Sequence, residues 1–141
     1  MSIDNATSQT CNQGFEWDGS TCVECGAGRY QDQPASRAQC YDWSVCAAGK
    51  KQNVVPTLKV NRGCTACDPG RYQASNSFTG TTCALWSLCA AGKKQNVAPT
   101  LKVNRGCTNC DAGKFQTSDI FTGTSCVRSA CLLFLFHSKI L

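Results

Sequence analysis

Large apolar side chains are sparse along this chain and follow no regular period. Leu, Ile, Val and Phe make up 25 of the 141 residues, and eight of those 25 come after Cys126. The remaining 17 in 126 residues fall below the roughly 20% at which chains begin to look disordered. No stretch repeats apolar residues every three to four positions, so we expect almost no helix. Burial at about 25 cal/mol per Å² cannot offset the ordering entropy with so few groups.

The clearest local pattern is a segment that occurs three times. It reads CGAGRYQDQPASRAQC from Cys25, CDPGRYQASNSFTGTTC from Cys67 and CDAGKFQTSDIFTGTSC from Cys110. Its fixed points are a Gly three residues after the cysteine, a basic residue, an aromatic residue and then Gln. This pattern predicts a short, twisted two-stranded ribbon in which the Gly makes the turn and the aromatic ring covers a disulfide.

The segments between these ribbons are copies of one another. Cys46 to Thr65 reads CAAGKKQNVVPTLKVNRGCT, and Cys89 to Thr108 differs only by Ala98 in place of Val55. Together the two kinds of segment form a unit of 43 residues, as from Cys40 to Cys83. We therefore expect an N-terminal tail and partial repeat over 1–24, repeats over 25–66 and 67–109, a half repeat over 110–126, and a divergent tail outside the fold over 127–141.

Thirteen cysteines in this length indicate a scaffold held by disulfides or by metal. Each disulfide closing a loop of about 15 residues contributes roughly 3 kcal/mol. Stable disulfides require an oxidising compartment, so we expect a secreted protein or the extracellular part of a cell-surface protein. Sequential, crossed and nested pairings each leave one cysteine over, so parity does not choose between them. Sequential pairing is favoured because it alone needs nothing from the divergent tail, and it uses Cys11, Cys22, Cys25, Cys40, Cys46, Cys64, Cys67, Cys83, Cys89, Cys107, Cys110 and Cys126.

The two ends of the sequence add little. Met1 to Thr10 has neither the basic start nor the apolar run of a secretory signal, which leads us to expect a fragment of a longer protein. Ala130 to Phe136 is apolar but seven residues long, against about 20 for a membrane span. Asn5-Ala6-Thr7 is a glycosylation sequon compatible with secretion.

The order of these motifs resembles a known family. Cys67-x2-Gly70-x-Tyr72, Cys83-x2-Trp86-x2-Cys89, and a polar loop that ends in Asn104-Arg105-Gly106-Cys107 resemble the cysteine-rich repeats of the tumour necrosis factor receptor family. Trp43 and Trp86 stand where a typical repeat has a third central cysteine, and we expect each to fill the place of the absent disulfide. The ephrin-receptor-like cysteine-rich repeat resembles the first half of the unit nearly as well.

The resemblance implies a fold class and a role. The fold is a small disulfide-rich one: an elongated ladder of cysteine-rich modules with short irregular β-ribbons and almost no helix. A tryptophan in place of the third central cysteine matches a variant module of that family that has one disulfide. This resemblance implies sequential pairing of the cysteines. The implied role is a non-catalytic extracellular module that binds protein ligands or serves as a receptor-type spacer.

Two kinds of cysteine chemistry compete with this interpretation. A zinc-binding intracellular module would use the three Cys-x2-Cys pairs, but zinc ribbons set such pairs about 15 to 20 residues apart. Here the pairs are separated by 38 and 39 residues with two further cysteines between them. A thiol oxidoreductase would need a βαβ setting, which the pattern does not provide.

Catalysis is not expected either. The single histidine, His137, lies in the divergent tail, so no Ser-His or Cys-His pair can form in the repeats. The carboxylates lie singly on predicted turns. We therefore predict no enzymatic activity, no cofactor and no metal.

The net charge of +5 comes largely from two loops. A sulfated glycan or an acidic protein could bind the basic side chains that these loops carry without any acid between them, whereas solvated loops are the alternative. The candidate binding residues are Lys50, Lys51, Lys59, Arg62, Lys93, Lys94, Lys102 and Arg105. Nucleic acid is not an expected partner because no aromatic residues alternate with these charges.

Overall fold

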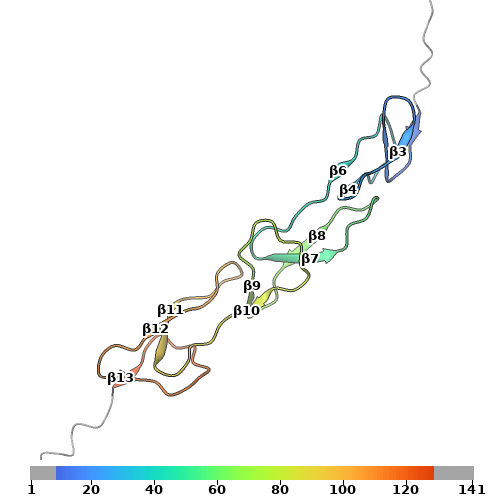
Figure 1. The fold of residues 1–141 in the computed structure, drawn as a ribbon. Coiled ribbons are helices and arrows are strands. Elements are labelled where there is room, and N and C mark those ends of the chain that lie inside the picture. Colours follow the sequence, from blue (N-terminus) through green and yellow to red (C-terminus); the bar gives the residue numbers. More distant parts are fainter. Residues whose placement is uncertain (1–8, 129–141) are drawn as a thin grey trace, which may run out of the picture. The chain divides into compact units, whose positions relative to one another are not determined.

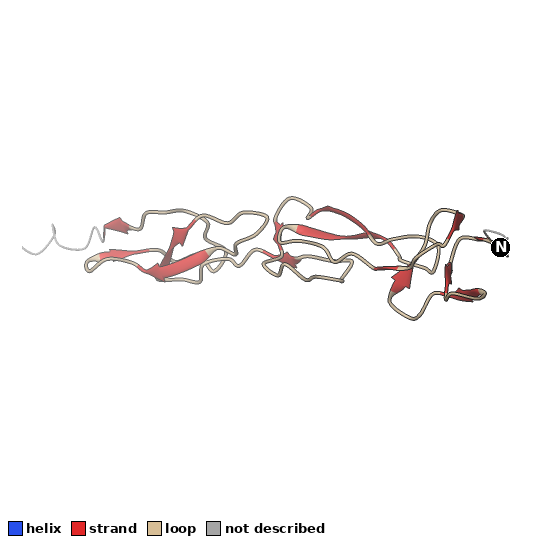
Figure 2. Cartoon of the chain, turned by 90° about the horizontal axis from the view of Figure 1, so that it is seen from above, coloured by secondary structure: helices blue, strands red, loops and turns tan. Residues whose placement is uncertain are grey.

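The computed structural model describes residues 9–128, and Asn5, Cys131 and His137 lie outside this range. The described residues contain short strands and loops and no helix (Figures 1 and 2). Residues 9–128 therefore contain no helix that is long and apolar enough to cross a membrane. The strands are β1 (Thr10–Cys11), β2 (Phe15–Trp17), β3 (Cys22–Glu24), β4 (Arg29–Tyr30), β5 (Ala35–Ser36), β6 (Tyr41–Asp42), β7 (Lys50–Val54), β8 (Gly63–Ala66), β9 (Arg71–Tyr72), β10 (Ala84–Leu85), β11 (Lys93–Val97), β12 (Gly106–Asn109), β13 (Lys114–Phe115) and β14 (Val127–Arg128).

Every described sheet is a pair of antiparallel strands. The pairs are β1 with β5, β2 with β3, β4 with β6, β7 with β8, β9 with β10, β11 with β12, and β13 with β14. A single two-stranded ribbon is marginal by itself in water, so these pairs depend on cross-links. The predicted small disulfide-rich fold with short ribbons and without helix is confirmed for the described residues.

Six disulfides provide the cross-links. They join Cys11 to Cys22, Cys25 to Cys40, Cys46 to Cys64, Cys67 to Cys83, Cys89 to Cys107, and Cys110 to Cys126. This is the sequential order. Among residues 9–128 the buried apolar residues are all cysteines apart from Ala38, so the disulfides themselves take the place of a core.

Two kinds of module alternate along the chain. Ribbon modules lie between Cys25 and Cys40, Cys67 and Cys83, and Cys110 and Cys126. Their predicted turn glycines, Gly28, Gly70 and Gly113, have φ values of 86°, 82° and 74°, a left-handed conformation that favours Gly. Hairpin modules lie between Cys46 and Cys64 and between Cys89 and Cys107, and each contains a long strand pair with a β-bulge.

The partial repeat before Cys25 is a shortened hairpin module. The amide of Cys25 donates to the carbonyl of Gly14 at 2.8 Å, as the amide of Cys110 donates to that of Gly92 at 2.8 Å. Gly14 and Gly92 each lie three residues after the first cysteine of their module. The Cys11–Cys22 disulfide spans 11 residues where the other two hairpin modules span 18.

The chain packs into two compact units whose limits differ from the sequence repeat. One unit contains the described residues up to Cys67 together with Ser75–Cys83, and the other contains Asp68–Ala74 with the described residues from Ala84 onward. In the first unit Cys46 and Phe78 pair their backbones, and in the second Cys89 pairs with Phe121. Each hairpin module therefore packs on the distal loop of the ribbon module that follows it.

The divergent tail was expected to begin at Val127, but the first two of its residues belong to the fold. Val127 pairs with Phe115 and Arg128 with Lys114, which places β14 in the third ribbon module. This pairing repeats that of β10 with β9 and of β6 with β4. The ribbon fold thus extends two residues past Cys126, because a ribbon needs a second strand whatever side chains it carries.

Candidate binding surface

Within each hairpin module, the basic residues lie in different surroundings. Arg62 is half-buried, and its Nε donates to the carbonyl of Ser44 at 2.8 Å. Its Nη1 donates to the carbonyl of Thr79 at 3.1 Å and to Oε1 of Gln52. Arg62 therefore holds the hairpin module against its neighbours. Its counterpart Arg105 is also half-buried, and its Nε and Nη1 have no hydrogen-bond partner among residues 9–128.

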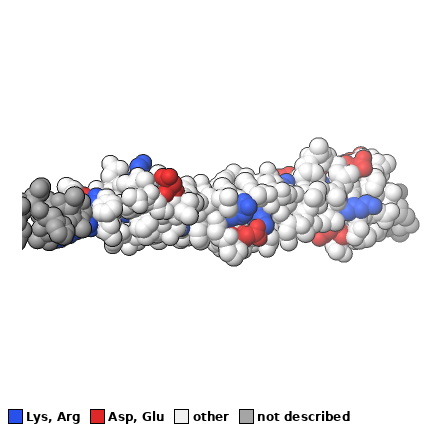
Figure 3. Space-filling model, turned by 90° about the horizontal axis from the view of Figure 1, so that it is seen from below, with Lys and Arg blue, Asp and Glu red and all other residues white. Residues whose placement is uncertain are grey.

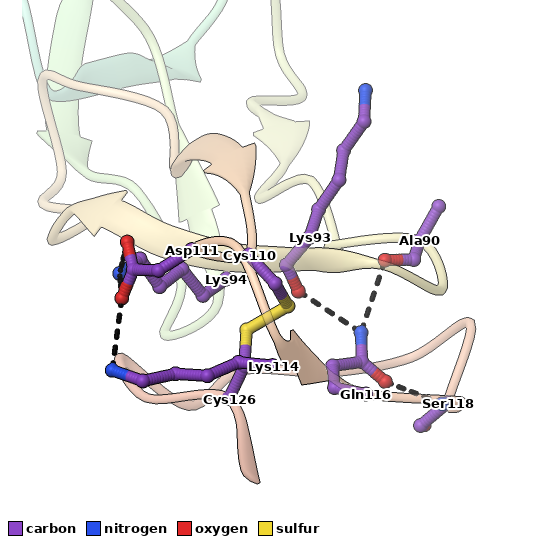
Figure 4. Close-up of a disulfide and its surroundings, with 9 residues drawn as sticks. All are labelled: Ala90, Lys93, Lys94, Cys110, Asp111, Lys114, Gln116, Ser118 and Cys126. Carbon is purple, nitrogen blue, oxygen red and sulfur yellow. Dashed lines mark hydrogen bonds and ion pairs between the residues drawn. A yellow bond between two sulfur atoms is a disulfide. The ribbon is translucent and has the colours of Figure 1, made fainter. Parts of the chain in front are cut away.

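Lys94 is held in an ion pair that the sequence did not indicate. Its Nζ lies 2.8 Å from Oδ1 of Asp111, and Nζ of Lys114 lies 3.0 Å from Oδ2 of the same carboxylate (Figure 4). The hydrogen bonds from Lys94 and then from Lys114 hold the pKa of Asp111 below its usual range. Asp111 is thus a link between a hairpin module and a ribbon module.

The first ribbon module makes the same link with the charges exchanged. Glu16 occupies the position of Lys94 and accepts from Nη1 of Arg29 at 3.0 Å. Gly26 stands where the third ribbon module has Asp111. Nη2 of Arg29 also donates to the carbonyl of Cys40 at 2.6 Å. An acid is therefore retained between two modules although its sequence position changes.

Most of the remaining cationic candidates are exposed. Lys50 and Lys59 are exposed in one hairpin module, and Lys93 and Lys102 in the other, whereas Lys51 is half-buried. On the face drawn in Figure 3, basic and acidic side chains form small mixed groups separated by uncharged surface.

Each hairpin module carries a loop that is attached to the preceding ribbon module. In the second unit the amide of Gln73 donates to the carbonyl of Leu101 at 3.0 Å. The indole Nε1 of Trp86 donates to the carbonyl of Thr100 at 3.0 Å. In addition, Oδ1 of Asn104 accepts from the amide of Ser87 at 2.7 Å. The loop over residues 100–104 is therefore fixed against residues 85–88.

An exposed apolar surface results from this attachment. Leu85 and Leu88 flank Trp86 and are 66% and 51% exposed, while Leu101 and Val103 on the attached loop are 38% and 46% exposed. We call these four residues the leucine surface. In the first unit the positions of Leu85 and Leu88 hold Asp42 and Val45. The two nearly identical hairpin modules therefore lie beside ribbon residues that differ.

A buried glutamine in each ribbon module was a fixed point of the sequence pattern, but no role could be assigned to it. Gln31, Gln73 and Gln116 are all buried, whereas Phe115, which was expected to cover a disulfide, is 44% exposed. Nε2 of Gln116 donates to the carbonyls of Ala90 and Lys93 at 3.0 Å each, and its Oε1 accepts from the amide of Ser118 (Figure 4). In this ribbon the side chain of Gln116 is buried, whereas the aromatic ring of Phe115 is exposed.

The three Cys-x2-Cys pairs do not form thiol sites in the structure. In each pair the two sulfurs belong to different disulfides, as with Cys64 bonded to Cys46 and Cys67 bonded to Cys83. Within residues 9–128, no group of three or more His, Cys, Asp or Glu side chains is arranged to hold a metal ion.

No protein-family model and no curated protein sequence matches this chain. Among solved structures, it is similar to one chain of the crystal structure of the mouse RANKL-OPG complex. The identity is 22%, the TM-score is 0.40, and the alignment covers 84% of this chain and 89% of that chain.

Proposed function

We propose that this chain is an extracellular, non-catalytic module that binds a protein partner through the leucine surface. The observation that supports the proposal most directly is the contrast between the two copies. The hairpin modules are nearly identical in sequence, while the exposed ribbon residues beside them change from Asp42 and Val45 to Leu85 and Leu88. A spacer would not need this difference, whereas a partner-specific surface would.

The physical character of the leucine surface also supports a protein partner. Exposed apolar side chains gathered around a fixed aromatic residue are typical of interaction sites. Disulfides on both sides, Cys67–Cys83 and Cys89–Cys107, restrict the backbone before binding. Little conformational entropy is then lost on association, which favours affinity.

Measuring the binding of the chain to an array of extracellular protein domains tests this function. The disulfide-bonded chain is compared with the double variant Leu85→Asp/Leu88→Asp. The matched control is Ile120→Asp, which changes an apolar residue that is 71% exposed in the same unit. We expect a domain that binds the unmodified chain and the control but not the double variant. Binding that the double variant retains in full would contradict the proposed surface.

A second candidate function is binding of a sulfated glycan through the exposed lysines. It is supported by Lys93 and Lys102, which are exposed in one hairpin module and have counterparts in Lys50 and Lys59. Replacing the exposed Lys50, Lys59, Lys93 and Lys102 by Gln should lower the salt concentration that elutes the chain from heparin resin. Unchanged elution would exclude this function.

A further inference from the structure

The loop that carries Leu101 and Val103 also carries an exposed cation, Lys102. The amide of Lys102 donates to Oγ1 of Thr100 at 3.2 Å, and the amide of Val103 donates to the same oxygen at 3.1 Å. The amide of Thr100 donates in turn to the carbonyl of Val103 at 2.9 Å, which closes the loop. The backbone of Lys102 is therefore held in place between two members of the leucine surface.

Lys102 has no acidic partner among the described residues. Its Nζ takes part in no ion pair or hydrogen bond within residues 9–128. The sequence over residues 69–110, which includes the whole leucine surface, contains no Asp or Glu. Asp111, the acid that follows this segment, is held by Lys94 and Lys114. The leucine surface therefore lies in a cationic segment that has no carboxylate of its own.

The first unit has an acid at the matching position of the ribbon. Asp42 stands opposite Arg29, and 3.8 Å separates Oδ1 of Asp42 from Nε of Arg29. In the second unit Leu85 stands opposite Arg71 instead. The change from Asp42 to Leu85 therefore adds an apolar side chain and removes a negative charge at one position.

A partner that covers the leucine surface must satisfy two requirements. It has to bring apolar side chains to Leu85, Leu88 and Leu101, because polar groups buried there would lose their hydrogen bonds to water. It also displaces water around Lys102, whose ammonium group then needs a negative charge to replace the lost hydration. A purely apolar partner would not compensate this charge, and a basic partner would be repelled.

We propose that the leucine surface binds an acidic amphipathic segment of a protein partner. The apolar side chains of this segment would contact the four residues of the surface, and an Asp or Glu beside them would pair with Nζ of Lys102. The positive charge of the surroundings would also speed the approach of such a segment. This inference rests on the proposed protein-binding function and adds the chemical class of the partner.

Selection from a library of random linear peptides displayed on phage tests the proposal. The full disulfide-bonded chain is the bait, and peptides that also bind the variant Leu85→Ser/Leu88→Ser are discarded. This variant removes the apolar side chains without adding charge. We expect the enriched peptides to carry Asp or Glu next to large apolar residues. No enrichment, or enriched peptides without an acidic residue, would overturn the proposal.

A matched pair of charge reversals locates the acidic contact. Residues 56–62 and 99–105 share the sequence PTLKVNR, in which Lys59 is the counterpart of Lys102. Lys102→Glu should weaken the binding of an enriched peptide at least about fivefold, measured by fluorescence anisotropy, whereas Lys59→Glu should leave it unchanged. No weakening by Lys102→Glu would overturn the proposal. Equal weakening by both variants would also overturn it, because general attraction to cations, as for a sulfated glycan, would then explain the binding.

The failure of this inference can be distinguished from failure of the proposed function. A domain that loses binding with Leu85→Asp/Leu88→Asp but keeps it with Lys102→Glu would leave the function in place and show that the partner is not acidic. Full binding by the double Asp variant would contradict the function itself, whatever the effect of Lys102→Glu.

Discussion

The indole Nε1 of Trp86 donates a hydrogen bond of 3.0 Å to the carbonyl oxygen of Thr100. Trp43 makes the same bond to Thr57 at 3.0 Å. Both tryptophans occupy the middle position of a Cys-x2-Trp-x2-Cys run, so the indole joins this run to the loop of the hairpin module that follows it. Unlike a disulfide, this bond can be removed without changing the cysteine pairing.

Replacement of Trp86 by Phe should loosen the attached loop while leaving the disulfides intact. The ring is kept, but the donor to Thr100 is lost, which is worth roughly 1 kcal/mol or less at an exposed site. We expect faster hydrogen exchange of the Thr100 amide, which donates to Val103 at 2.9 Å. Trp17→Phe serves as the control because no described residue accepts from its indole. Unchanged exchange at Thr100 would show that the indole bond does not hold the loop.

Gln116 should be essential for stability despite its polar side chain. Replacement by Met keeps the size of the side chain but leaves the carbonyls of Ala90 and Lys93 without this donor. The expected loss in free energy of unfolding is about 1–3 kcal/mol. Thr117→Ala, at the neighbouring exposed position, should change stability little. Chemical denaturation of the oxidised protein measures both, and equal stability of the two variants would refute a structural role for the buried glutamine.

The Asp111 ion pairs predict a pH dependence with a definite sign. Lys94 and Lys114 lower the pKa of Asp111 in the folded state. Their contribution to stability is therefore fully present above the unfolded pKa of about 3.9 and is lost as the pH falls through the lower folded pKa. Asp111→Asn should be less stable than the unmodified chain at pH 7, and the difference should disappear in strong acid. A difference that stays constant with pH would mean that the charge of Asp111 is not involved.

Gly106 should not tolerate a side chain. A Cβ at this position would stand 2.7 Å from Oδ1 of Asn96 and 2.8 Å from Cβ of Val97, closer than such atoms approach in proteins. Gly106→Ala should therefore lower the melting temperature by several degrees. A Cβ at Gly26 would have no neighbouring atom within 4 Å, so Gly26→Ala should leave the melting temperature unchanged. Equal melting temperatures would show that the β-bulge can shift to admit a methyl group.

The sequence allowed the disulfide-rich fold to be predicted because its governing constraints are local. Cysteine spacing, few large apolar residues and a repeated turn glycine are all visible without coordinates. The predicted sequential pairing agrees with the six disulfides of the structure, which close loops of 11 to 18 residues. Short loops of this kind keep each pairing within one module.

The contacts between modules could not be predicted from the same pattern. The carboxylates, Asp111 among them, were expected to lie singly on turns, but its partner Lys94 lies 17 positions earlier, on another module. Likewise, Arg62 resembled a free cation in the sequence, although it is held by backbone carbonyls of two separate segments. The sequence did not identify Ala35 as the counterpart of Phe78. That match depends on strand pairing, because Ala35 pairs with Cys11 as Phe78 pairs with Cys46. In each case the decisive neighbour is set by packing between modules.

The most direct test of the central claim is a disulfide map of the intact chain. The chain is produced in an oxidising compartment, alkylated without reduction and digested, and its cross-linked peptides are identified by mass spectrometry. We predict twelve cysteines in six sequential disulfides and one alkylated cysteine, Cys131. Thirteen alkylated cysteines with bound metal, or a crossed set joining Cys67 to Cys89 and Cys83 to Cys107, would contradict the account.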